Sequence, residues 1–165
     1  MSMPTPRKTS ATRNDLPADT RRQVAALLNQ HLADLTDLYT QTKFAHWNIK
    51  GMSFIGLHKL FDEFAEIVEE NIDTIAERVT ALGYSALGTV RQSAAASQVE
   101  EFPIEVNEAK AVVTALAERY ASVGKTVRAG IDAADEIADA DTADLLTDVS
   151  RNLDESLYFL EAHLA

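Results

Sequence analysis

The sequence predicts an all-α fold: four long helices packed as a bundle, with one long crossover link between the second helix and the third. Apolar residues recur at helical spacing in four segments. No segment alternates with period two, and none gathers β-branched residues between turn signals. The 22-residue connection over residues 83–104 is long enough to return the chain to the other end of the bundle.

The first two helices are predicted to form a hairpin. The first begins after Pro17 and runs to about residue 46, and Gly51 marks the turn behind it. The second is expected over about residues 53–82, where the apolar spacing continues until Gly83. A short link places two consecutive helices antiparallel and side by side.

The rest of the chain is predicted to form a second hairpin. The crossover link carries a short helix in the segment RQSAAASQ. A third long helix is expected over about residues 105–131, followed by the aspartate-rich segment DAADEIADAD. The fourth helix begins near Asp141, which is of a residue type that caps helices, and its leucines and valines continue at helical spacing to residue 164.

The N-terminal residues differ from the rest of the chain in charge and composition. Residues 1–15 are predicted to be a flexible basic tail before a bundle domain of residues 16–165, because they carry prolines among polar side chains. The first 14 residues hold three basic residues and no acid, whereas the remainder has 12 basic and 26 acidic residues, a net charge of −14. An acidic body repels nucleic acid and attracts cations. Any DNA binding therefore has to use the basic residues of the tail, Arg7, Lys8 and Arg13.

Composition excludes several other classes of protein. The chain has no cysteine, so it has neither a disulfide framework nor a thiolate metal site. No apolar run approaches the length of a membrane span, and the first residues lack the apolar segment of a secretory signal. We therefore expect a cytoplasmic protein with no membrane partner.

Two histidines flank the first predicted turn. His46 and His58 are equidistant from residue 52, beside Gly51. Residues equidistant from the turn lie level in an antiparallel hairpin, so both imidazoles can face the same small volume. Two histidines in such a place can bind iron, zinc or copper.

Acidic residues follow these histidines along the second helix. At about 100° per residue, one face of this helix carries His58, Asp62, Asp73 and Glu77. A rise of about 1.5 Å per residue puts Asp62 and Asp73 roughly 16 Å apart, too far for one metal ion to bridge. One straight helix therefore cannot supply the whole ligand set.

A second copy of the chain resolves this difficulty. His58 and Glu77, and likewise Asp62 and Asp73, are symmetric about a point between residues 67 and 68. Two antiparallel copies of the helix that cross there form two equivalent sites. A mixture of imidazole and carboxylate ligands suits Fe(II). The predicted ligand set is His46, His58 and Asp62 from one subunit with Asp73 and Glu77 from the other.

These residues also have an interpretation without a metal. A stripe of acids is commonly a solvated helix face, and single histidines near turns are common. Apolar residues interrupt the acids, however, so the helix is not exposed on all sides. Di-iron centres inside a single bundle use Glu-x-x-His pairs, and no histidine of this chain has a glutamate three residues before it.

The motif AHWNIKG, followed by FIGLHKLFDEF and then NIDTIAERVTALG, strongly resembles the Dps family (DNA-binding proteins from starved cells), the mini-ferritins. The resemblance runs from about Thr12 to the C-terminus and includes TRND, ALGT, ERYA and DTADLLTDVSRNLDESLYFLE. It implies a ferritin-like four-helix bundle, a homo-oligomer that is a hollow dodecamer, and a ferroxidase centre at the two-fold interface. The family's motif positions match the five residues of the predicted ligand set one by one.

The resemblance also implies a function. Family members oxidise Fe(II), typically with hydrogen peroxide and otherwise with dioxygen, and they store ferric mineral in the cavity. Trp47 matches a family tryptophan beside the first histidine, and either traps oxidising equivalents or packs as an ordinary aromatic. Iron enters through acidic three-fold pores in this family, whereas aspartates at a helix start also cap the helix and complement its dipole. The pore candidates here are Asp135, Asp139, Asp141 and Asp144.

Many Dps proteins bind DNA through a basic N-terminal tail. The candidate DNA contacts are Arg7, Lys8 and Arg13, and twelve such tails on one shell would add avidity. We expect sequence-independent binding, weaker than that of a lysine-rich tail, with association with the nucleoid as its consequence. The alternative function is a DNA-compacting structural protein with secondary metal chemistry, and a helical adaptor without chemistry is the third.

Two further acids share the symmetry of the proposed dimer. Glu66 and Glu69 lie on the same stripe and would face each other between the two centres. Facing carboxylates repel unless they are protonated or bridged by a cation. We expect an accessory cation site there, and side chains splayed into water are the alternative.

Overall fold

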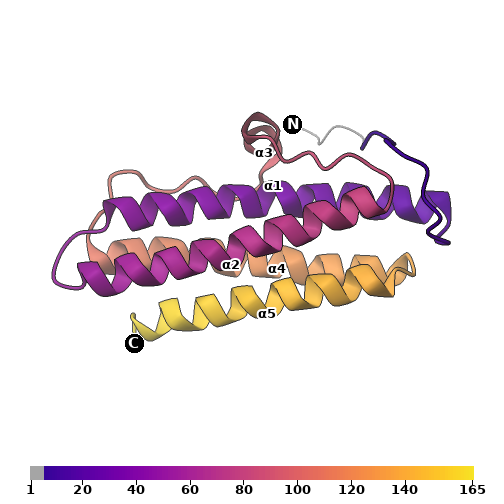
Figure 1. The fold of residues 1–165 in the computed structure, drawn as a ribbon. Coiled ribbons are helices and arrows are strands. Elements are labelled where there is room, and N and C mark those ends of the chain that lie inside the picture. Colours follow the sequence, from indigo (N-terminus) through magenta and orange to yellow (C-terminus); the bar gives the residue numbers. More distant parts are fainter. Residues whose placement is uncertain (1–5) are drawn as a thin grey trace.

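The computed structural model describes residues 6–165 and places five α-helices among them. Four long helices lie side by side, and the short α3 lies on the outer side of α1 (Figure 1). Their bounds are α1 Ala18–Asn48, α2 Phe54–Ala81, α3 Val90–Ala96, α4 Ala109–Glu136 and α5 Ala140–Ala162. The predicted four-helix bundle with a short helix in its crossover link is confirmed.

The long helices form two antiparallel hairpins, α1 with α2 and α4 with α5. Gly51, in the turn after α1, has a φ of 102°, a left-handed conformation that glycine adopts without the steric cost of a Cβ atom. The crossover link then carries the chain from the end of α2 back along α1 to the start of α4 (Figure 1). As a result α4 also runs antiparallel to α1.

The second hairpin differs from the prediction at its helix ends. The α4 helix begins at Ala109, later than expected, because the Glu108 carboxylate accepts two backbone N–H groups of the first turn. It continues to Glu136, and α5 begins at Ala140, so seven of the ten residues of the aspartate-rich segment are helical. Asp139 rather than Asp141 caps α5, since its carboxylate accepts a backbone N–H of the first turn.

Apolar side chains fill the space between the four long helices along the whole bundle. Burying each large side chain contributes about 1.5–3 kcal/mol to folding. The Tyr120 hydroxyl, deep in this core, lies 3.1 Å from the Thr42 hydroxyl, so its polar end is satisfied. No helix in residues 6–165 is both long and apolar enough to cross a membrane. The largest fully buried side chains include Leu28, Leu32, Leu35, Leu38, Phe61, Phe64, Ile75, Leu116 and Tyr120.

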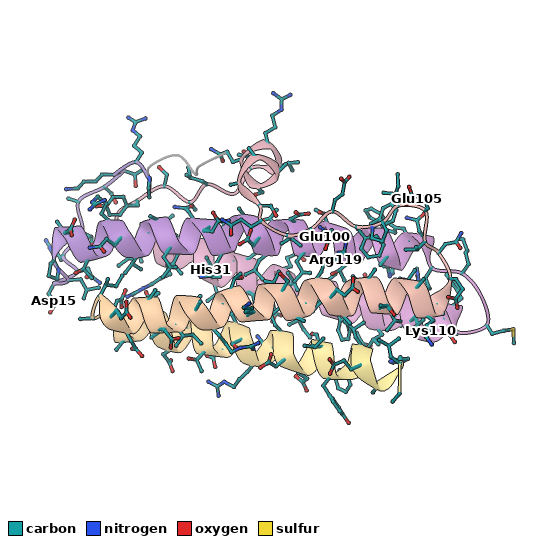
Figure 2. All side chains as sticks on the ribbon, turned by 180° about the vertical axis from the view of Figure 1, so that it is seen from behind. Asp15, His31, Glu100, Glu105, Lys110 and Arg119 are labelled. Atoms are coloured by element: carbon teal, nitrogen blue, oxygen red, sulfur yellow. The ribbon has the colours of Figure 1, made fainter. Side chains whose placement is uncertain are left out.

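Polar side chains of the bundle fasten the crossover link. Asn29 on α1 donates to one backbone carbonyl and accepts one backbone N–H within residues 85–87, at 3.1 and 2.7 Å. Arg119 on α4 is buried and donates to the carbonyls of Glu100 and Glu101 (Figure 2). These bonds satisfy the backbone of a long segment, and they hold it against α1 and α4.

The described part of the predicted tail, residues 6–15, is hydrogen bonded to the bundle. The Thr9 N–H donates to the Gly83 carbonyl at 2.9 Å, and the Ser85 N–H donates to the Arg7 carbonyl at 2.9 Å. Part of the segment predicted as a flexible tail therefore has backbone partners in the loop after α2. The first five residues of the predicted tail lie outside the described part of the chain.

Candidate metal centre

The turn between α1 and α2 places two histidines side by side. His46 lies near the end of α1 and His58 near the start of α2. Their ring centroids are 3.7 Å apart, and the ring planes are inclined by 19°. The prediction that these residues lie level across the turn is therefore confirmed. His46 is only 8% exposed, and His58 is partly buried.

Each imidazole is held by the backbone of the other helix. The Nδ1 atom of His46 lies 2.6 Å from the His58 carbonyl oxygen, and the Nδ1 atom of His58 lies 2.8 Å from the His46 carbonyl oxygen. A carbonyl oxygen only accepts hydrogen bonds, so Nδ1 carries the proton in each neutral ring. Both Nε2 atoms therefore keep a lone pair, as in histidine ligands whose other nitrogen is hydrogen bonded.

Asp62, one turn after His58 on α2, brings a carboxylate to this pair. Its Oδ1 atom lies 3.9 Å from His46 Nε2 and accepts a hydrogen bond from Lys43 Nζ on α1 at 2.5 Å. The Lys43 hydrogen bond is the largest cause that lowers the pKa of Asp62, and the charge of Lys43 adds to it. The carboxylate is thus held ionised beside the histidines. A cation that binds it has to compete with the Lys43 ammonium.

Lys43 is the residue of this site that the sequence analysis missed. It lies one helical turn before His46, on the same face of α1, and this spacing was the available signal. Ligand chemistry alone does not predict a basic residue there. Its role becomes visible only when α2 brings Asp62 next to it.

The other two predicted ligands lie farther along α2, and both are exposed. Because α2 is one continuous helix, a rise of about 1.5 Å per residue separates Asp62 from Asp73 by roughly 16 Å. Within residues 6–165, no three histidine, aspartate or glutamate side chains are placed to hold a metal ion. One chain therefore carries two separate groups: the histidine half-site of His46, His58 and Asp62, and the acidic half-site of Asp73 and Glu77.

Large apolar side chains are exposed near the turn between α1 and α2. Trp47, the predicted accessory residue, is 63% exposed, and Phe54 and Ile55 on the other side of the turn are also exposed. The Phe54 ring centroid lies 4.9 Å from that of His58. Apolar residues exposed together around polar groups mark surfaces that another protein covers. This observation favours a site that a second chain completes.

The acids predicted to bind an accessory cation lie between the two half-sites. Glu66 and Glu69 are both exposed on α2. Their position on the helix agrees with the predicted stripe, because Glu66 lies one helical turn after Asp62 and Glu69 lies one turn before Asp73.

The predicted pore residues lie where α4 meets α5, at the opposite end of the bundle from the two histidines (Figure 1). Asp139 does not fit this role, because it is 2% exposed and its carboxylate binds Arg78 on α2 at 2.8 and 3.0 Å and the Thr142 hydroxyl at 2.6 Å. It fastens α5 to α2, which corrects the prediction for this residue. The other three predicted pore residues are exposed: Asp135, Asp141 and Asp144.

Comparison with known proteins agrees with this architecture. The family model of the ferritin-like domain matches residues 25–165. The DNA protection during starvation protein of Agrobacterium fabrum is 43% identical over 157 residues, which cover 95% of this chain and 97% of that protein. The protein of the same name from Mycolicibacterium smegmatis is 32% identical over 141 residues, covering 86% of this chain and 76% of that protein.

Solved structures have the same fold. DpsC from Streptomyces coelicolor superposes with a TM-score of 0.90 at 32% identity, covering 96% of this chain and 92% of that chain. The Dps protein from Vibrio cholerae, described as a member of a broad superfamily of ferritin-like diiron-carboxylate proteins, superposes with a TM-score of 0.86 at 26% identity, covering 96% of this chain and 100% of that chain. By sequence and by fold, this chain belongs to the Dps family of ferritin-like proteins.

Proposed function

We propose that this protein is a ferroxidase that oxidises Fe(II) at sites shared between two subunits and stores the ferric product in a hollow dodecamer. Membership of the Dps family supports iron storage and DNA protection in general. One observation carries the more specific proposal. The reciprocal hydrogen bonds at Nδ1 of His46 and His58 direct the Nε2 lone pair of each neutral ring to a ligand, and His46 Nε2 lies 3.9 Å from the Asp62 carboxylate.

Each site combines the histidine half-site of one subunit with the acidic half-site of its partner. The two α2 helices cross antiparallel between residues 67 and 68. His58 then lies opposite Glu77 of the partner subunit, and Asp62 lies opposite the partner's Asp73. The exposed apolar side chains around the turn support this arrangement, because an interface core is rich in aromatic residues and poor in charge.

The five side chains suit iron as a substrate. Neutral imidazole and carboxylate bind Fe(II), and the harder Fe(III) ion prefers the oxygen ligands that line the cavity. One hydrogen peroxide molecule accepts one electron from each of two Fe(II) ions, its O–O bond breaks, and two hydroxide ions form. Peroxide and iron are thus consumed together without release of a hydroxyl radical. Dioxygen is the alternative oxidant.

Three further sets of residues contribute to this function. Iron enters near the turn between α4 and α5, where three subunits meet. Each subunit contributes three exposed acids there: Asp135, Asp141 and Asp144. Glu66 and Glu69 hold an accessory cation between the two centres of a dimer. Trp47 lies at the surface beside His46, where it can trap oxidising equivalents that leave the site.

DNA binding through the N-terminal segment is the second function that we propose. Arg7, Lys8 and Arg13 are exposed, although the backbone around them is docked on the loop after α2. Each phosphate contact adds a salt-dependent contribution to affinity, and twelve copies on one shell add avidity. The acidic body opposes binding, so we expect weak and sequence-independent affinity. A mainly structural, DNA-compacting role remains the alternative.

Stopped-flow measurement of Fe(II) oxidation tests the first function. An assembly of measured mass is loaded with Fe(II) without oxygen and mixed with hydrogen peroxide or with dioxygen. We expect fast oxidation by peroxide in the wild type and only the background rate in His46→Ala and Asp73→Ala. Equal rates in all three proteins would contradict a ferroxidase built from these residues.

Deletion of residues 1–14 separates the two functions. We expect the shortened protein to lose DNA binding in a low-salt mobility-shift assay and to oxidise Fe(II) at the wild-type rate. DNA binding that survives the deletion would refute the assignment to this segment.

A further inference from the structure

His31, on α1, is a histidine that the candidate metal centre does not use. Its side chain is only 4% exposed, and it lies on the side of α1 that faces α4 (Figure 2). Neither of its ring nitrogens has a hydrogen-bond partner within residues 6–165. Buried polar groups are nearly always hydrogen bonded, so a bare imidazole in the core needs an explanation.

The ring packs directly against α4. A Cβ atom on Gly130 would lie 2.3 Å from His31 Nε2 and 3.0 Å from its Cε1. The imidazole therefore occupies the space that a side chain at position 130 would need. Leu146 of α5 borders the same space, 3.2 Å from that Cβ position. This packing leaves no room for a counterion between the ring and α4.

In the part of the chain that the structure describes, no charged group of the surrounding elements is hydrogen bonded to the ring. Asp34, the next buried acid on α1, accepts hydrogen bonds from Gln30 and from the Gln98 N–H on the side of the crossover link. Surface pairs engage the nearby charges of α4 and α5: Arg128 with Asp154, and Arg151 with Asp148. Other charges on the surrounding helices are exposed, and they include Asp73 on α2, Arg91 on α3, Asp132 on α4 and Asp144 on α5.

We propose that the contact between His31 and Gly130 is an acid-sensitive lock between α1 and α4. At neutral pH the uncharged ring packs against Gly130 and holds the two helices together. A protonated ring would place an unpaired charge in the core, and a buried charge without a partner is strongly unfavourable. The charge is relieved when the helices part at this layer, so acidification opens the bundle there.

The direction of the pH dependence follows from the two states of the chain. Burial lowers the pKa of His31 from 6.5 to about 4, because it penalises the charged form. Between these two values the unfolded chain binds more protons than the folded one, so stability falls as the pH falls from about 6.5 to about 4. At pH 5 this single group lowers the folding equilibrium constant about 30-fold relative to pH 7.5.

Hydrogen–deuterium exchange at the histidine C2 position, read by mass spectrometry on the assembled full-length protein, tests the lock without any substitution. We expect His31 to exchange much more slowly than His163, the exposed histidine at the end of α5, and to titrate near pH 4. Titration of His31 with a midpoint near pH 6.5 would overturn the proposal.

Acid unfolding of two variants gives the second test. His31→Leu keeps an apolar side chain in the lock and cannot be protonated, whereas His163→Leu removes a histidine from the surface. At equal subunit concentration, we expect His31→Leu to unfold at lower pH than the wild type and His163→Leu to unfold with it. The His31→Leu protein should oxidise Fe(II) at the wild-type rate at neutral pH.

An unchanged pH dependence in His31→Leu would contradict the lock. If that variant does not fold at neutral pH, the C2 exchange of the wild-type protein decides the question by itself.

Discussion

His46 and His31 lie on the same helix and are buried to a similar degree, yet their surroundings differ. His46 has a backbone carbonyl at Nδ1 and a carboxylate 3.9 Å from Nε2. His31 has no hydrogen-bond partner in the described residues and packs against Gly130. Burial alone therefore does not distinguish a candidate metal ligand. The orienting carbonyl and the neighbouring carboxylate support the proposal for His46, because together they fix the tautomer of the neutral ring and supply a second donor.

Removal of His46 should have the largest effect. Loss of a group that merely supports a ligand typically costs 10–100-fold in metal affinity or activity, so we expect His46→Ala to slow peroxide-dependent oxidation by at least about 100-fold. His31→Leu is the matched control on the same helix, and its rate should not change. Stopped-flow kinetics at neutral pH measure both. Similar losses in the two variants would remove the distinction between these histidines.

Substitution of Gly130 tests the packing of the His31 ring against α4. The Cβ atom of Gly130→Ala would overlap the His31 ring, and overpacking of a core typically costs about 1–3 kcal/mol in the free energy of unfolding. Gly124→Ala is the control on the same helix. Its Cβ would lie 3.6 Å from the nearest atoms, which belong to flexible side chains.

The control should gain about 1 kcal/mol from helix propensity. Urea unfolding at pH 7.5 measures both proteins. If Gly130→Ala were as stable as Gly124→Ala, His31 would not fill the space beside α4.

Substitution of Lys43 at the candidate metal centre should have a smaller effect. Lys43→Gln removes the ammonium that competes for Asp62, so we expect Fe(II) to bind a few-fold more tightly at pH 7. Anaerobic Fe(II) titration at pH 7 measures this change in affinity.

Lys125→Gln, which removes an exposed lysine from α4, controls for net charge. Weaker Fe(II) binding at pH 7 in Lys43→Gln than in this control would show that Lys43 supports the site and does not compete with iron.

The smallest effect concerns the docked N-terminal segment of residues 6–15. The surroundings of His31 and His46 should not change. Gly83 has a φ of 89°, and a Cβ atom there would lie 3.0 Å from the Ser10 carbonyl oxygen. We expect Gly83→Ala to cost about 1 kcal/mol locally and to speed amide exchange at Thr9, with exchange in the bundle core unchanged. Hydrogen–deuterium exchange of peptides from residues 6–15 measures this. Unchanged exchange there would mean that the pairing does not depend on Gly83.

The sequence predicted what depends on periodicity and on counting from a turn. Apolar spacing gave the four long helices, and equal distance from residue 52 placed His46 and His58 level. The same counting showed that Asp62 and Asp73 cannot share a metal ion within one chain. These inferences succeed because helix geometry converts sequence separation directly into distance and direction.

What the sequence did not predict depends on contacts between residues far apart in the chain. Asp139 was predicted to line a pore, but it is buried, and its carboxylate binds Arg78 and the Thr142 hydroxyl. Lys43 became part of the site only through Asp62, and His31 became a core residue only through Gly130. Local composition carries no signal for such pairs, since each partner alone is compatible with several environments.

Mixed assemblies test most directly whether the two half-sites work across subunits. His46→Ala and Asp73→Ala proteins are each expected to be inactive. When equal amounts are dissociated and reassembled together, a mixed dimer has one site with both substitutions and one site with neither. Random pairing makes about a quarter of all sites intact, so the mixture should oxidise Fe(II) at about a quarter of the wild-type rate. A mixture as inactive as its two components would contradict the shared site.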